Sequence, residues 1–162
     1  TYLFNCSVKE NIRLGNPDAS DTEVFNAAKL ACCDEFIKEL ESGYDTVVGN
    51  AGNKLSGGEK QRISIARALI RETDILVADE ILSNLDNETA LKIERELLNL
   101  NEITLIAVTH RLFEETLTDF DEIIVINEGN IVETGTFKDL IDLKGLFYKI
   151  YNLSENSKIP SK

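Results

Sequence analysis

Several features that define large protein classes are absent from this sequence. Its longest apolar runs, at residues 75–78 and 123–126, are far shorter than the ~20 residues that span a bilayer. Thr1 is not followed by a basic and then apolar leader, so we expect no signal peptide. The cysteines form no C-x-x-C pair and their number is odd, which favours reduced thiols over a disulfide framework. They are Cys6, Cys32 and Cys33.

Basic residues are scarce. The chain has 17 Lys and Arg against 29 Asp and Glu, a net charge of −12. A protein that binds nucleic acid normally presents a basic face, so this balance argues against a bare nucleic-acid binder. With 162 residues, 43% of them apolar and 28% charged, the chain is long enough for one globular domain with a hydrophobic core.

The first part of the chain is predicted to be mainly helical. Residues 1–15 show no long period and are interpreted as a loop with a short helical turn. Ser20 or Asp21 begins a helix, and residues 36–40 form a second, shorter one. Residues 44–49 are expected to be extended.

Residues 55–62 carry the strongest local pattern. Ser56 and Glu59 form an S-x-x-E capping box, and the following helix should run to about Ile70. This helix is apolar nearly all round, which is typical of a helix buried on most sides. Gly57 and Gly58 leave its first amides without covering side chains, and such a helix N-terminus favours an anion.

Two continuous apolar runs follow, at residues 75–78 and 103–108, and we interpret them as strands covered on both faces. Asp86 caps the helix expected between them, so the three elements predict a parallel βαβ unit. Residues 123–126 and 130–133 predict a hairpin.

Two short helices, at residues 137–141 and 146–151, are expected to close the fold, and residues 154–162 to fray. We therefore divide the chain into a helical subdomain at 1–72, a sheet-containing part at 73–153 and a flexible tail.

Two carboxylates lie where a ligand is expected, at the carboxyl end of a buried parallel strand. Asp79 should occupy a poorly solvated place that suits Mg²⁺ beside a triphosphate. Glu80 could polarise an attacking water. The alternative is an acid pair that only caps a helix or lines a loop. His110, the single histidine, follows the next strand and is either structural or part of the same site.

Four motifs in this order resemble those of ABC-type ATPases. Residues 55–62 resemble the LSGGQ signature, with Glu59 in place of Gln. Residues 75–80 resemble the Walker B strand with its catalytic glutamate, residues 83–86 the D-loop, and residues 109–111 the H-loop. Residues 3–20 and 41–48 are similar to segments of ABC exporters.

The resemblance implies an α/β fold: a partial P-loop NTPase (RecA-like) parallel sheet preceded by the ABC helical subdomain. It also implies roles for single residues. The catalytic residues would be Glu80 and His110, the Mg²⁺ ligand Asp79, and the nucleotide-binding residues Ser56, Gly57, Gly58, Gln61 and Asp86. In this family the signature acts on ATP held by the opposite subunit.

The resemblance is incomplete. No G-x-x-x-x-G-K-[ST] occurs, so the phosphate-cradling P-loop is missing, and the Q-loop glutamine would lie upstream of Thr1. Ile81 and Leu82 replace the usual Ala-Thr after the catalytic glutamate. We therefore expect the C-terminal part of a nucleotide-binding domain, inactive when alone.

The parent protein is expected to be the ATPase of an ABC exporter, with ATP and Mg²⁺ as cofactors. Its partners would be a second nucleotide-binding domain, head to tail, and transmembrane domains on the cytoplasmic side of the plasma membrane. One alternative is a chromosome- or repair-type ABC ATPase acting on DNA, although the chain has no heptads and is acidic. Another is a non-catalytic regulatory module.

Overall fold

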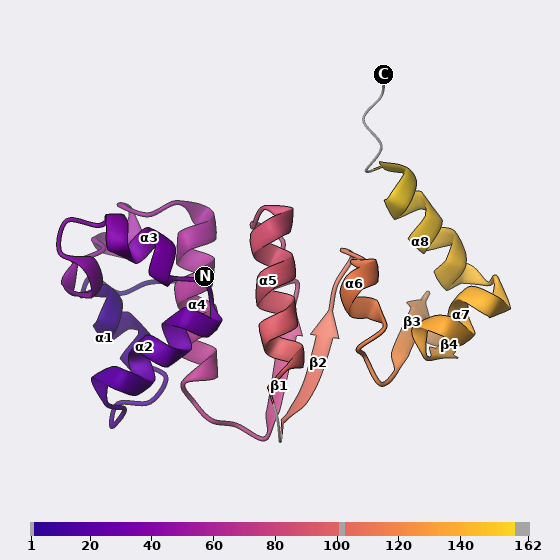
Figure 1. Ribbon diagram of the computed structural model, residues 1–162, viewed down its shortest axis with the longest axis horizontal. Helices are drawn as coiled ribbons and strands as arrows, with labels where there is room; N and C mark the ends of the chain where they lie inside the picture. The colour runs from indigo at the N-terminus through magenta and orange to yellow at the C-terminus, as the bar shows by residue number, and fades with distance from the viewer. Residues whose placement is uncertain (1, 101–102, 158–162) are drawn as a thin grey trace. The chain divides into compact units, whose positions relative to one another are not determined.

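The computed structural model describes residues 2–100 and 103–157. The chain forms two compact units that divide between Val108 and Thr109 (Figure 1). This division rests on contacts within the chain, whereas the predicted boundary after residue 72 separates a helical from a sheet-containing part. That boundary stays a prediction.

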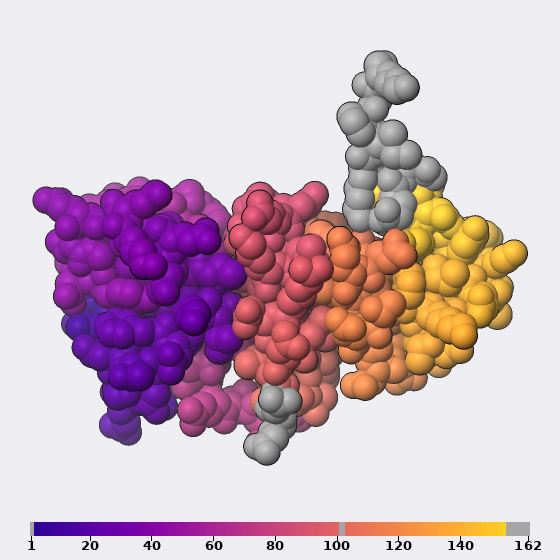
Figure 2. All heavy atoms as spheres, viewed as in Figure 1, coloured from indigo at the N-terminus to yellow at the C-terminus, as the bar shows by residue number. Residues whose placement is uncertain are grey.

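Four helices make up most of the first unit. They are α1 Val8–Arg13, α2 Asp21–Leu30, α3 Asp34–Glu39 and α4 Gly57–Leu69, with short 3₁₀ turns at Gly43–Asp45 and Asn50–Gly52. Helices α1 and α2 pack against each other and against α4. Ile12, Val24 and Ile63 are fully buried between them. The space-filling view shows the atoms of these helices closely packed (Figure 2).

The same capping chemistry starts three of these helices. The hydroxyl groups of Ser7, Ser20 and Ser56 each accept a hydrogen bond from the backbone N–H of a glutamate three residues on. The carboxylate of that glutamate in turn accepts a hydrogen bond from the serine N–H. Ser20 and Ser56 were predicted. The helix after Ser7 fits the short helical turn expected within residues 1–15, and its S-x-x-E pattern is present in the sequence.

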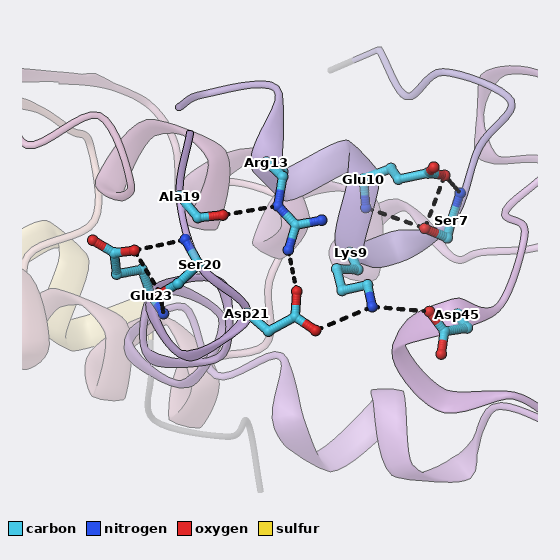
Figure 3. A network of polar contacts seen from close by, with 9 residues as sticks. All are labelled: Ser7, Lys9, Glu10, Arg13, Ala19, Ser20, Asp21, Glu23 and Asp45. Atoms are coloured by element: carbon cyan, nitrogen blue, oxygen red, sulfur yellow. Dashed lines mark hydrogen bonds and ion pairs between the residues drawn. The ribbon is translucent and has the colours of Figure 1, made fainter. Parts of the chain in front are cut away.

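A polar network on the surface connects the first two helices (Figure 3). The Asp21 carboxylate contacts both the Arg13 guanidinium and Lys9 Nζ, the latter at 3.3 Å. Lys9 also reaches Asp45 Oδ1 at 3.3 Å. Exposed ion pairs of this kind contribute little each, roughly 0–1 kcal/mol, so the apolar core dominates.

The sheet of the first unit is the predicted parallel pair. Strand β1 Ile75–Asp79 runs beside β2 Thr104–Val108, with Ile75 opposite Thr104 and Asp79 opposite Val108. Helix α5 Asn87–Leu98 connects them, and Asp86 caps it as expected. The α/β character predicted from the sequence is confirmed.

The burial predicted for these strands is wrong for one face of the sheet. Ile75, Val77, Ile106 and Val108 share that face, and their exposed fractions lie between 49% and 61%. Continuous apolar runs are typical of strands whose side chains are buried on both faces of the sheet. Within the described residues of the first unit these four side chains stay largely exposed, although Val77 also lines a cavity beside α4.

The second unit, as far as residue 157, contains a hairpin and three helices. Strand β3 Ile123–Asn127 pairs antiparallel with β4 Asn130–Gly135, and the turn at Glu128 and Gly129 is as predicted. The helices are α6 Glu114–Leu117, α7 Phe137–Leu143 and α8 Leu146–Ser157. Leu117, Val125, Leu140 and Phe147 form the core of this unit.

Helix α8 is longer than expected. Fraying was predicted from residue 154, but the helix continues to Ser157; the rest of the predicted tail, 158–162, lies outside the described residues. Its start is fixed by Glu133 of β4, whose carboxylate accepts hydrogen bonds from the backbone N–H groups of Leu146 and Phe147. A carboxylate at a helix N-terminus complements the helix dipole.

Two predicted absences can be compared with the structure. None of the helices in the described residues has the length and apolar character needed to cross a bilayer. The three cysteines are free thiols, and burial raises the pKa of Cys33.

Candidate functional site

The N-terminus of α4 is open to the surroundings. Ser56 and Gly57 are exposed, and a methyl group added at Gly57 would have no atom within 4 Å. Ser56 N donates to Glu59 Oε2 at 2.9 Å, and Ser56 Oγ accepts from Glu59 N at 3.3 Å. An anion could therefore approach the amides of this first turn from outside, next to the Glu59 carboxylate.

Gly58 brings this helix start against the loop of residues 83–86. A Cβ built on Gly58 would lie 3.3 Å from Leu85 Cδ2 and 3.4 Å from the carbonyl oxygen of Asn84. Both distances are tight for a Cβ, so glycine allows the loop to come this close. The signature segment and the D-loop segment, separate in the sequence, are therefore neighbours in the first unit.

Asp79 and Glu80 end β1, but both are exposed. The poorly solvated environment predicted for Asp79 is therefore wrong for this chain. The physical reason is the strand's alternation: Asp79 lies on the same face as Ile75 and Val77, whose side chains are also exposed.

The backbone of Glu80 is strained. Its φ of +47° lies in the left-handed region, which costs a residue with a side chain roughly 1–2 kcal/mol. Two backbone hydrogen bonds hold it there: Glu80 N donates to the Val108 carbonyl at 2.8 Å, and the Glu80 carbonyl accepts from Ser83 N at 3.1 Å. We refer to residues 80–83 as the Glu80 turn. Strain of this kind is concentrated at functional sites.

Gln61 does not point out of the helix start. Its side chain is only 8% exposed, and Nε2 donates a hydrogen bond to the backbone carbonyl of Ile81, in the Glu80 turn. Oε1 is buried without a hydrogen-bond partner among the described residues. The sequence carries no signal for this contact, because its acceptor is a backbone oxygen that any residue at position 81 would supply.

Asp86 acts as the predicted helix cap. Its Oδ1 accepts from Thr89 N at 2.9 Å, and this backbone hydrogen bond is the main reason why the pKa of Asp86 lies below its ordinary value. The side chain is exposed, and its predicted contact with nucleotide stays a prediction. His110 is also exposed, two residues after β2; it belongs to the second unit, and its predicted role likewise stays a prediction.

A cavity of about 160 Å³ separates α4 from β1. Gln61, Ser64 and Asp79 line it together with apolar side chains of both elements. Sites that enclose a small-molecule ligand are usually about 300–1,000 Å³, so this cavity is too small for a nucleotide.

The described residues contain no cluster of three or more His, Cys, Asp or Glu that could hold a metal ion. Mg²⁺ in nucleotide sites commonly takes one or two carboxylates, with the remaining ligands from phosphate and water. Asp79 and Glu80, adjacent at the end of β1, fit that partial set of ligands.

Comparisons with known proteins identify the family of this chain. A sequence model described as "ABC transporter" matches residues 3–83. A putative multidrug export ATP-binding/permease protein of Staphylococcus aureus strain COL is 49% identical over 153 residues, covering 93% of this chain. The chain belongs to the ABC transporter family.

Other members of the ABC transporter family support the same assignment. The corresponding protein of Staphylococcus aureus strain bovine RF122 is 48% identical over 153 residues. A bacterial Atm1-family ABC exporter, solved with ATP bound, superposes with a TM-score of 0.87 at 39% identity, over 96% of this chain and 27% of that one.

The family assignment settles two earlier expectations. The fold is that of part of a P-loop NTPase, as predicted, and the alternative of a DNA-acting repair ATPase is not supported. The chain spans about a quarter of the length of the curated relatives it matches, 26% for the strain COL protein.

Proposed function

We propose that this chain is the C-terminal part of a nucleotide-binding domain that hydrolyses ATP to drive an ABC exporter. One observation carries the proposal. An open helix N-terminus at Ser56 and a strand ending in Asp79 and Glu80 occur in one compact unit, joined through the loop of residues 83–86.

Most of the site residues then have a role in line with their chemistry. The first amides of α4, at Ser56 to Gly58, bind the γ-phosphate of ATP held by a second domain, head to tail. Asp79 assists Mg²⁺, which when bound neutralises charge on the phosphates. Glu80 orients the attacking water and accepts its proton, and His110 contacts the γ-phosphate.

The proposed partners follow from the relatives. Their names combine an ATP-binding and a permease function in one protein. We therefore propose that the complete protein pairs this part with transmembrane domains, on the cytoplasmic side of the plasma membrane, and with a second nucleotide-binding domain. Nucleic acid has no place in this scheme, in line with the net charge of −12.

Glu80→Gln in the full-length protein tests this function. The substitution removes the proton acceptor but leaves the phosphate-binding amides, so ATP should still bind while turnover falls at least about 100-fold. Glu96→Gln on the exposed face of α5 is the matched control and should keep wild-type turnover. Glu80→Gln turnover near the wild-type rate would contradict the proposed role.

The chain by itself should not hydrolyse ATP. Phosphoryl transfer depends mainly on positioning and charge neutralisation, and no P-loop motif occurs in the sequence. A few exposed amides should bind Mg-ATP only in the millimolar range, about −4 kcal/mol. Titration calorimetry and a phosphate-release assay on the chain measure both quantities. Micromolar binding, or turnover that Glu80→Gln abolishes, would contradict this expectation.

A further inference from the structure

Gln61 joins two parts of the candidate site that serve different tasks. It lies in the second turn of α4, the helix whose open N-terminus is proposed to meet a phosphate. Its side-chain amide donates to the carbonyl of Ile81, the residue directly after Glu80. One buried side chain therefore connects the signature helix to the turn that carries the proposed proton acceptor.

The Glu80 turn needs support from outside itself. Glu80 has a φ of +47°, and the turn is closed by the hydrogen bond from Ser83 N to the Glu80 carbonyl. A conformation of this kind persists only where the surrounding structure holds it. The bond from Gln61 fixes the direction of the Ile81 carbonyl inside that closed turn.

A second contact reaches the same loop from the same helix. Gly58 approaches Leu85 and the Asn84 carbonyl closely enough that a Cβ would lie 3.3 to 3.4 Å away. Gly58 and Gln61 are three residues apart and so lie on one face of the helix. Two contacts therefore join the first turns of α4 to residues 81–85.

We propose that Gln61 is a positioning residue: through the Ile81 carbonyl it holds the Glu80 turn and couples it to the start of α4. This inference rests on the proposed function. In that function the α4 start contacts ATP of the opposite domain, whereas Glu80 serves the site of its own domain. Gln61 therefore makes water activation in one site depend on phosphate contact in the other.

The test uses Gln61→Met in the full-length protein. Methionine has a similar length and no amide, so the Ile81 bond is lost with little change in volume. We expect kcat to fall about 10- to 100-fold, as for a misplaced catalytic group, while the KM for ATP changes less than about twofold. Ser64→Ala alters the same cavity but leaves the hydrogen bond from Gln61 to the Ile81 carbonyl in place, so it should keep wild-type kcat.

Two further variants make the result decisive. Gln61→Glu keeps the length and one oxygen but loses the donating amide, so it tests the same bond if the Met variant does not fold. In a Glu80→Gln background, Gln61→Met should cause no further loss of turnover, because Gln61 acts through Glu80. ATP-dependent dimer closure should also persist in this double variant.

Three outcomes separate this inference from the proposed function. Wild-type kcat for folded Gln61→Met, with Glu80→Gln inactive, would overturn the positioning role alone. Loss of ATP-dependent closure in the double variant would also overturn it, since Gln61 would then contact the phosphate directly. Wild-type turnover of Glu80→Gln would instead overturn the proposed function.

Discussion

The helical region, residues 2–70, and the β1–β2 sheet differ in how completely they bury their apolar side chains. The helical region encloses Ile12, Val24 and Ile63 completely. The sheet leaves Ile75 and Val77 exposed by 58% and 61%. Both regions are rich in Ile, Val, Leu and Ala, so composition does not explain the difference. A helical cluster can be closed by helices that are near in sequence, whereas a parallel strand needs cover from other elements on two faces.

A matched pair of substitutions should give the largest contrast between these regions. Ile63→Ala removes a side chain that is 0% exposed and should cost about 2–5 kcal/mol of unfolding free energy. Ile75→Ala, at a position that is 58% exposed, should cost less than about 1 kcal/mol. Urea denaturation of the two variants measures both. Equal losses would show that the sheet face is buried in solution.

The exposed sheet face should make copies of the chain associate. Apolar surface of this kind favours association. Ile106→Lys should therefore raise the dissociation constant for self-association at least about tenfold. Leu14→Lys in the helical region is the control, because Leu14 and Ile106 are both 49% exposed. Sedimentation equilibrium with hydrophobic-dye binding provides the readout. A monomer at high concentration that binds no dye would contradict the expectation that the sheet, unlike the helical region, exposes an apolar surface that associates.

Helix caps should be equally strong in both regions, because a cap depends on its own helix and not on cover from elsewhere. Ser20→Ala at α2 and Asp86→Ala at α5 should each cost about 1 kcal/mol. Ser42→Ala is the control, since that side chain makes no capping hydrogen bond. Thermal unfolding of the three variants gives the comparison. A loss of stability at α2 but not at α5 would show that the contribution of a cap depends on how well the surrounding region is buried.

Acid should produce the smallest effect, centred on the helical region. Hydrogen bonds from Ser7 and Ser20 hold the pKa of Glu10 and Glu23 below the ordinary 4.5. The stabilisation they provide is complete above that value and is lost as pH falls through the lowered pKa. The urea concentration at the unfolding midpoint, measured from pH 6 downward, should decrease once the pH drops below about 4.5. Substituting both glutamates by Gln should make the urea midpoint depend less on pH. An unchanged pH dependence would mean that other titratable groups cause it.

Sequence patterns predicted the features that depend on neighbours along the chain. The caps at Ser20, Ser56 and Asp86 and the turn at Glu128 follow from short motifs, whose hydrogen bonds join residues two to four apart. The helix after Ser7 carries the same capping pattern, in the segment where a short helical turn was predicted.

Features that depend on distant residues were not predictable in this way. Exposure of Asp79 depends on what covers β1, and burial of Gln61 depends on a carbonyl twenty residues away. The motifs correctly indicated the ABC transporter family, whereas the roles they suggest for single residues stay predictions. They could not indicate that Gly58 touches the 83–86 loop, because that distance arises only when α4 and the loop fold together.

The left-handed backbone at Glu80 has a consequence for how this position responds to selection. Glycine adopts that conformation without strain and asparagine tolerates it, so either should stabilise the turn while removing the carboxylate. A library at position 80 selected for thermal stability should accumulate Gly and Asn, whereas one selected for ATP turnover should retain Glu. Under drift without selection for activity, Glu80 should therefore be among the first site residues to disappear.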